Sequence, residues 1–393
     1  MIRGPRALVA AAVTAGAVAV GTTISLSALS TELAGEFDVG PAAAAAPFST
    51  ALCVALLAGA ATGPIAQRRG ARPLLAAGAV LLPAGSAVVA VTSSFPLALL
   101  AAGLGVGGGA GCVLVPVLTA VGTGVGRHRA TALGVAAAGG PLGTAVLPPA
   151  AVWLAERDGP RGALLGLAVV SAVLLAGCAA TVHSGPGAAS ARPGPVRTPG
   201  FGRLYLAAVA LSGAVFVPLA HLPTYAAAHG LGLPFAAAML STLSVSGVAG
   251  RLLCGAAAAR FGARTGLRAA ALGLVVALGL WLVAGADPLL LVAFAVVFGV
   301  ANGAYVALLP ELLVELHGPA GLGARLGLLH TASAVAALVG PTSAAAMTAW
   351  TGSPGAAIVV AAGAALVGWS ALREASTHPR AAAVPAPTEG GSR

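Results

Sequence analysis

Long apolar runs separated by short polar or basic segments are the dominant pattern of this chain. Each run is close to the ~20 residues that a helix needs to cross a bilayer core. The runs are continuous and do not alternate with a period of two, which favours helices over a β-barrel. We therefore predict an all-α membrane protein with twelve transmembrane helices, at residues 7–29, 42–66, 73–92, 96–120, 130–153, 162–182, 204–226, 235–259, 269–286, 289–314, 326–349 and 355–372.

The pattern also repeats once along the chain. A basic hairpin after the second run contains Gly63, Arg68, Gly70 and Arg72, and the same residue types recur after the eighth run as Gly255, Arg260, Gly262 and Arg264. Six helices return a chain to the same side of a membrane, so two parallel six-helix repeats are consistent with this spacing. We predict a first bundle at residues 1–182, a Gly- and Pro-rich cytoplasmic linker at 183–203, a second bundle at 204–373 and a disordered cytoplasmic tail at 374–393.

Charge then predicts the orientation. The 20 basic residues are all arginines, and with a cytoplasmic N-terminus nearly all of them fall in inner loops or at the two termini. Only Arg157 and Arg161 fall in outer loops, beside most of the acidic residues, and Arg251 lies inside a run. By the positive-inside rule, both termini are cytoplasmic in a multi-pass protein of the cell membrane.

Composition narrows the function classes. Residues are 58% hydrophobic and 8% charged, which is far from the ~25% charge of soluble domains. The net charge of +10 does not indicate nucleic-acid binding, because the arginines are not gathered on one face or arm. The four cysteines lack metal-ligand spacing, and no phosphate loop follows the glycine run 103–111, which we assign to close helix packing. We expect no cofactor and no metal.

The repeated hairpin resembles the hallmark loop of the major facilitator superfamily, Gly-x-x-x-Asp-Arg-x-Gly-x-Arg after helix 2, which is often echoed after helix 8. The acidic position is Gln67 in the first copy and Ala259 in the second. In that family the acid belongs to a charge network that latches the two halves on the cytoplasmic side. The resemblance therefore implies a major facilitator fold in which the usual latch lacks its acid.

A narrower resemblance is to monocarboxylate-transporter-like members of that superfamily. It rests on segments 221–230 and 250–251 in helices 7 and 8, and on 127–134 entering helix 5. Further matches are Gly299, Gly303, Pro310 and Glu315 in helix 10, with Gly340-Pro341 in helix 11. The group's Asp-Gly signature and lysine in helix 1 are absent, and no Asp lies one turn before Arg251.

Arg251 is the sharpest candidate for chemistry. It lies nine residues before Arg260, or about 13 Å at 1.5 Å per residue, inside an apolar helix. A charge at that depth indicates a functional site by default, although the side chain could instead extend toward the interface. The resemblance implies that this arginine pairs with an anionic substrate, and a guanidinium fork suits a carboxylate.

Glu311 and Glu315 lie one turn apart near the cytoplasmic end of helix 10. Either could bind and release protons, or both could pair with Arg325 or neighbouring loop arginines and close the gate by charge alone. His221 and Tyr225 in helix 7 are candidate substrate ligands, as are Asn302 and Tyr305 in helix 10, with packing or interhelical hydrogen bonding as the alternative. His330 is placed near the membrane interface.

The sequence predicts a secondary active transporter that moves a small organic anion, a monocarboxylate, with protons by alternating access. The expected partners are the lipid bilayer, the small-molecule substrate and protons, and we expect a monomer. One alternative is a proton-coupled exporter of apolar drug-like compounds or metabolites. A membrane-embedded enzyme or non-transporting receptor is disfavoured, because the chain contains no catalytic grouping or soluble sensor domain.

Overall fold

The computed structural model describes residues 4–40, 43, 46–126, 128–182, 200–231, 233–353 and 355–375. The predicted linker up to residue 199, and the predicted tail from residue 376, lie outside these described residues. The helices of the first half are α1 (Pro5–Ala28), α2 (Ser30–Phe37), α4 (Ala46–Arg69), α5 (Arg72–Val91), α6 (Phe95–Leu100), the π-helix η1 (Ala101–Gly107), α7 (Gly108–Gly124), α8 (Arg129–Ala137) and α9 (Gly139–Thr181). Those of the second half are α10 (Phe201–Ala228), α11 (Leu233–Phe261), α12 (Ala263–Ala284), α13 (Pro288–His317), α14 (Leu322–Thr351) and α15 (Gly355–Ala375).

These helices make twelve membrane crossings. Eleven helical stretches of the described chain are long and apolar enough to span a bilayer. The stretch from Arg129 to Thr181 is too long for one crossing, and Gly159, with φ 73°, breaks it into two. The division between the ninth and tenth helices is also present, since Asp287 accepts hydrogen bonds from the amides of Leu289 and Leu290 and so begins α13. The predicted count of twelve is confirmed.

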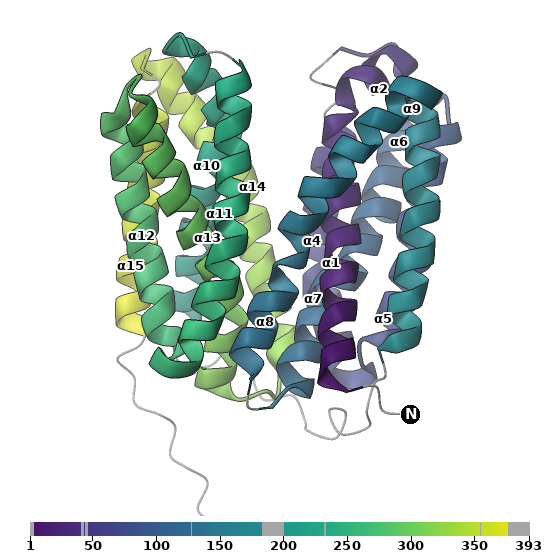
Figure 1. Cartoon of the computed structure of the whole chain (residues 1–393), viewed down its shortest axis with the longest axis horizontal. Helices are drawn as coiled ribbons and strands as arrows, with labels where there is room; N and C mark the ends of the chain where they lie inside the picture. The colour runs from purple at the N-terminus through teal and green to yellow at the C-terminus, as the bar shows by residue number, and fades with distance from the viewer. Residues whose placement is uncertain are drawn as a thin grey trace, which may run out of the picture.

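Two bundles with separate hydrophobic cores form the molecule. One core draws on residues 11–182 and the other almost entirely on residues 201–372. Figure 1 shows the two bundles side by side, in contact at the end where α8 begins and apart at the end where α2 and α6 lie. The glycine run in η1 and α7 packs closely as predicted, because a Cβ at Gly109 would lie 2.6 Å from the amide nitrogen of Leu82 on α5.

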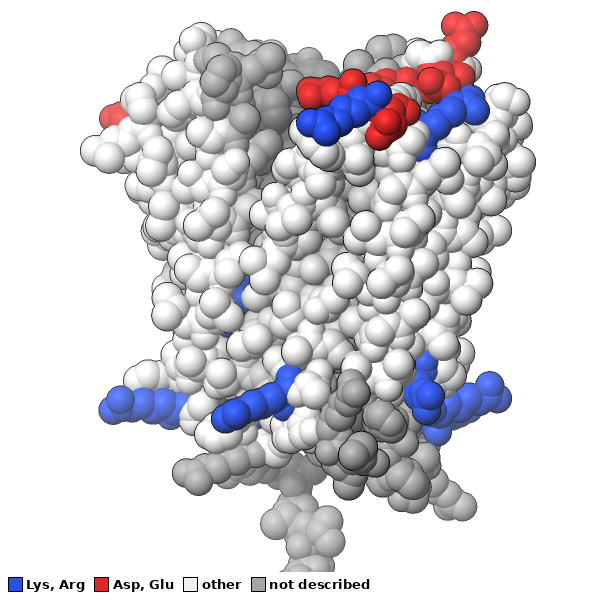
Figure 2. Space-filling model, turned by 45° about the vertical axis from the view of Figure 1, so that its right-hand side comes forward, with Lys and Arg blue, Asp and Glu red and all other residues white. Residues whose placement is uncertain are grey.

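Charge separates the two ends of the molecule. Figure 2 shows a broad band with few charged atoms between an end that carries acidic side chains and an end where only basic ones are seen in this view. We call these the acidic face and the basic face: the first includes Glu36 and Asp158, and the second includes the exposed Arg68, Arg69 and Arg260. Between them, apolar side chains such as Val80 and Val173 are about two-thirds exposed, as expected of a surface that meets lipid.

Candidate substrate site and gate

The two bundles meet along two glycine-lined seams at the basic face. In the first seam, Gly63 of α4 lies so close to Gly323 of α14 that a Cβ on Gly63 would overlap the Gly323 carbonyl oxygen. Gly59 and Gly327 make an equally close approach one turn further in. The two backbones can touch in this way only because neither helix carries a side chain there.

The second seam joins α8 of the first bundle to α11 of the second. A Cβ on Gly255 would lie 3.1 Å from the Cα of Gly134, and one on Gly134 would lie 2.5 Å from the carbonyl oxygen of Arg251. Gly63 and Gly255 are the first glycines of the two hairpin copies. The duplicated sequence thus supplies one seam glycine to each contact between the bundles. Gly70 and Gly262, also equivalent, both have positive φ, 79° and 82°, which glycine adopts without strain.

Gln67 crosses the first seam at the position where the family motif has an acid. Its Oε1 accepts a hydrogen bond from the Gly323 amide at 2.9 Å, and its Nε2 donates to the Pro319 carbonyl at 3.3 Å. Gly323 is in the first turn of α14, where an amide has no partner within its own helix. The neutral amide therefore caps α14 and also satisfies a carbonyl, which a carboxylate could not do.

Glu311 forms an ion pair between the bundles. Glu311 is 6% exposed, and its carboxylate accepts hydrogen bonds from Nε and Nη2 of Arg129 at 2.8 and 2.7 Å. Arg129 begins α8 in the first bundle, and Glu311 is on α13 in the second. This two-point pairing is the strong, directional form of a charged hydrogen bond. Sequence reasoning named Glu311 as a gating residue but did not single out Arg129 as its partner.

Glu315 lies one turn further along α13, and its role differs. Its Oε1 accepts a hydrogen bond from the Ala263 amide at 2.7 Å, at the start of α12 within the same bundle. A carboxylate at a helix N-terminus is stabilised by the unpaired amides and the helix dipole. Arg325, the partner considered for both glutamates, instead donates to the Ala320 carbonyl at 2.8 Å.

Arg251 lies at the closed end of the space between the bundles. On α11 its position falls between Gly247 and Gly250, which face α13, and Gly255, which faces α8. A Cβ on Gly247 would lie 3.1 Å from its Nη1, so the guanidinium lies over that glycine. Its Nε is buried and, among the described residues, has no hydrogen-bond partner. The guanidinium also has no carboxylate within ion-pair distance in the described part of the chain.

Asn302 on α13, like Arg251 on α11, lies between two directions in which its helix packs against neighbouring helices. Tyr305 on this helix faces α10, while Gly299 and Gly303 face α11. At 100° per residue, position 302 falls between these two directions, and its side chain is partly exposed. Asn302 and Arg251 are the two predicted site residues that keep a polar group available at this end.

The other predicted ligands are engaged inside the second bundle. Tyr305 is buried, and its hydroxyl lies 3.3 Å from Oγ of Ser212. Tyr225 donates to the Gly285 carbonyl at 2.9 Å, and Nε2 of His221 lies 3.1 Å from the Pro341 carbonyl oxygen. These bonds join α10 to α13, to the end of α12 and to α14, respectively.

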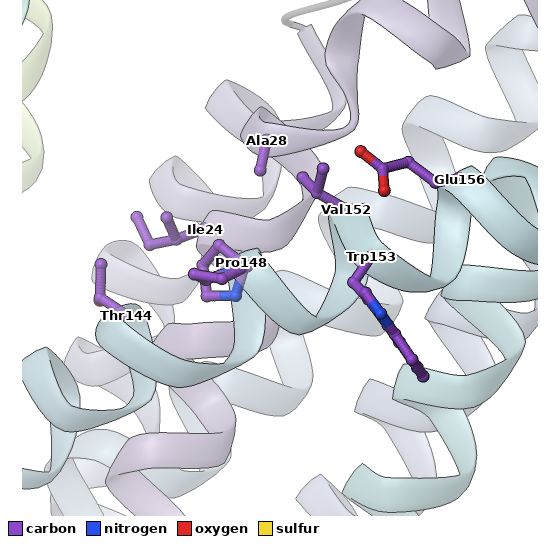
Figure 3. Close-up of a pocket in the computed structure, with 8 residues that line it drawn as sticks. Ile24, Ala28, Thr144, Pro148, Val152, Trp153 and Glu156 are labelled. Carbon is purple, nitrogen blue, oxygen red and sulfur yellow. The ribbon is translucent and has the colours of Figure 1, made fainter. Parts of the chain in front are cut away.

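A second feature lies in the first bundle, near the acidic face. A pocket of about 530 Å³ opens between α1 and the first part of α9, as Figure 3 shows. Its lining is mainly apolar, including Ile24, Pro148 and Val152, with the carboxylate of Glu156 at one end. The guanidinium of Arg157 lies 3.8 Å from the ring of Trp153, another lining residue.

Twelve spans in two bundles that meet at one face, with an arginine in a span that has no ion-pair partner among the described residues, are typical of a membrane transporter. Comparison with known proteins agrees. The Major Facilitator Superfamily profile matches residues 11–287. The chain therefore belongs to this superfamily of transporters, and the resemblance predicted from the repeated hairpin is confirmed.

Curated relatives are named as transporters too. Monocarboxylate transporter 11 of Homo sapiens is 29% identical over 356 residues, covering 84% of this chain and 74% of that protein. Monocarboxylate transporter 3 of Rattus norvegicus is 30% identical over 352 residues, covering 83% and 70%. An MFS-type transporter of Gibberella moniliformis is 29% identical over 290 residues, covering 71% and 70%.

Solved structures share the fold. The transporter FucP in the outward conformation superposes with a TM-score of 0.75 at 16% identity, covering 96% of this chain and 100% of that one. The human organic anion transporter MFSD10 (TETRAN) gives a TM-score of 0.73 at 19% identity, covering 94% and 99%. The chain is a multi-pass membrane transporter with the major facilitator fold, and not an enzyme.

Proposed function

We propose that this transporter moves a small organic anion of the monocarboxylate type together with protons, and that Arg251 binds the anion. The observation that carries the proposal is the buried, unpartnered Nε of Arg251 at the closed end of the space between the bundles. An unpaired charge within a membrane span is costly, and a carboxylate that accepts two parallel hydrogen bonds would offset that cost. The relatives named monocarboxylate transporters support the same substrate class.

Asn302 is the second proposed substrate ligand, because an amide can donate to the other carboxylate oxygen or accept from a substrate hydroxyl. His221, Tyr225 and Tyr305 contribute by fixing α10 against its neighbours, since each makes a hydrogen bond inside the second bundle. The proposed substrate ligands are therefore Arg251 and Asn302, and the other three polar residues have a structural role.

The gate of the proposed mechanism is the pair of seams with the Arg129–Glu311 ion pair and Gln67. These contacts close the basic face while the bundles stand apart at the acidic face (Figure 1). By the positive-inside rule the basic face is cytoplasmic, so this arrangement is open to the outside of the cell membrane. A cysteine replacing exposed Asp158 should react with an impermeant maleimide in intact cells, and one replacing exposed Arg68 only after permeabilisation; the reverse would refute this orientation.

Uptake into proteoliposomes tests the substrate proposal. We expect the full chain to take up labelled monocarboxylates faster when the vesicle interior is alkaline, with protein-free liposomes as background. Arg251→Gln should lower this uptake at least tenfold, whereas Arg260→Gln, at an exposed arginine of the same helix, should retain it. Unchanged carboxylate uptake by Arg251→Gln would exclude Arg251 as the anion ligand.

A second candidate function, export of apolar drug-like compounds by proton exchange, is favoured by the apolar pocket between α1 and α9. Pockets of several hundred Å³ with mainly apolar lining suit compounds of drug size. Resistance to such compounds on expression, with no carboxylate flux in vesicles, would favour export. Glu156→Gln should then lower resistance, because it removes the carboxylate from the pocket.

A further inference from the structure

His330 on α14 is a titratable residue whose surroundings differ from those of the residues described so far. Its Nδ1 is buried and, in the described part of the chain, has no hydrogen-bond partner. The sequence places it near the membrane interface, but the structure places it further in. It lies eight residues beyond the first residue of α14, or about 12 Å from the basic face at 1.5 Å per residue.

The first seam ends at this histidine. Gly323 and Gly327 of α14 are in contact with α4, and a Cβ on Gly59 would lie 3.2 Å from the Cβ of His330. Toward α10, α14 presents Ser333 and Gly340. At 100° per residue, position 330 falls between the direction of α4 and that of α10. His330 therefore lies above the closed first seam, as Arg251 lies above the second.

The two residues lie at similar depths on two helices of the second bundle, α11 and α14. Arg251 lies ten residues before the end of α11, about 15 Å from the basic face at 1.5 Å per residue. Figure 1 shows α11 and α14 on the side of the second bundle that faces the first. Arg251 and His330 thus lie on the two helices of the second bundle that border the first, each above one of the closed seams.

The acidic candidates for proton coupling are already engaged. Glu311 is paired at two points with Arg129, and Glu315 accepts a backbone hydrogen bond at the start of α12. Either would have to leave a charged partner or a helix N-terminus in order to take up a proton. His221 is bonded to the Pro341 carbonyl oxygen. His330 is the buried titratable group in the described chain for which protonation breaks no observed contact.

Few charged or titratable groups face His330. On α10, Tyr205 is hydrogen-bonded to Thr331, the residue after His330, and on α13 Tyr305 is hydrogen-bonded to Ser212. Within α14, Arg325 donates to the Ala320 carbonyl. α15 carries no titratable side chain between Gly355 and Leu372. The neighbouring positions of α4 and α7 are Gly59 and Val115.

We propose that His330 is the proton carrier of this transporter and that it binds the proton that moves with the anion. This proposal rests on the proposed transport of a monocarboxylate. With the acidic face toward solution, the imidazole takes up a proton while Arg251 holds the anion. After the seams open at the basic face, the anion leaves and the proton passes from His330 to solution. One proton and one anion cross together, and no covalent bond is made or broken.

Two transport assays separate coupling from binding. Counterflow exchanges labelled for unlabelled substrate with no pH gradient, and it needs binding and alternating access but no net proton movement. Accumulation under an inside-alkaline gradient also needs coupling, with a limit of about tenfold per pH unit for one proton per anion. We expect His330→Gln to keep counterflow within about twofold of the unsubstituted chain and to lose accumulation above protein-free liposomes.

The matched control is His229→Gln, directly after the last residue of α10, where the imidazole stacks on Tyr225. This variant should keep both activities. Full accumulation by His330→Gln would overturn the proposal, and so would loss of counterflow in both His330→Gln and His330→Asn, since the residue would then serve binding or folding. If the unsubstituted chain shows no counterflow of any monocarboxylate, the proposed substrate class itself is wrong.

Discussion

Arg251 and Glu311 are both charged side chains within membrane helices, and the structure gives them opposite surroundings. Glu311 is bound at two points by Arg129, so its charge is compensated within the protein. Arg251 has no such partner in the described chain, and its Nε is buried. An uncompensated charge in a span is expensive, which makes Arg251 the group whose environment a substrate anion would improve most.

Exchanging the two charges of the gate tests its role at the scale of single residues. Glu311→Arg alone should destabilise the state closed at the basic face by about 1.5–3 kcal/mol, the range for hydrogen bonds to charged groups, and more if the two cations repel. The double variant Arg129→Glu with Glu311→Arg should restore most of that loss. Spin labels at positions 158 and 286, which are exposed on the acidic face of the first and second bundle, would report how far apart the bundles are at that face as an interspin distance.

In the single variant the interspin distance should shorten, because opening the basic face brings the bundles together at the acidic face. The double variant should return to the longer distance. A distance that is unchanged in the single variant would mean that the pair does not control closure.

The sequence indicates which residues are functional candidates better than it indicates which residues they contact. Arg251 was identified because a lone arginine interrupts an apolar run, and Glu311 because it lies near the end of one. Their surroundings depend on which helices of the two bundles touch, and no local pattern contains that information. Gln67 is an example: in the sequence it is only the absence of the motif's acid, whereas in the structure it crosses the first seam with two hydrogen bonds.

At the scale of helices, the glycines of the seams set how closely the bundles can approach. Gly63→Ala would place a methyl group against the Gly323 carbonyl, so α4 and α14 could not keep their present contact. Gly279→Ala on α12 is a suitable control, since nothing lies within 4 Å of the added carbon. A helical glycine with free space should gain about 0.5–1 kcal/mol on replacement by alanine.

Hydrogen exchange around residues 319–327 would measure this effect. In the unsubstituted chain the Gly323 amide is bonded to Gln67. Gly63→Ala should separate the helices and speed exchange of this segment, whereas Gly279→Ala should leave it unchanged. Equal protection in all three proteins would show that the glycine contact is dispensable for closure.

The helices themselves could be predicted from hydropathy with small errors. α12 begins six residues before the predicted run, because Ala263 is capped by Glu315 from a distant part of the chain. The short helix α2 was not predicted: it is amphipathic and polar, and its Glu36 pairs with Arg161 at 2.7 Å on the acidic face. Both differences come from tertiary contacts, which a window of local hydropathy does not include.

At the scale of the whole molecule, the duplicated hairpin explains the symmetry of the gate. Each copy supplies a glycine to one seam, so the repeated element closes both sides of the same face. The copies differ at the position where the family motif has an acid: Gln67 is buried in the first seam and Ala259 is exposed. The two seams therefore use different chemistry around the same backbone contact.

The central claim is that this transporter recognises a carboxylate through Arg251. Calorimetric binding of a transported monocarboxylate and of its neutral primary amide to the purified full chain tests it without any contribution from transport kinetics. We expect the unsubstituted chain to bind the carboxylate at least tenfold more tightly than the amide, and Arg251→Gln to abolish this preference. Equal affinity for the two compounds in the unsubstituted chain, or a preference that survives in Arg251→Gln, would contradict it.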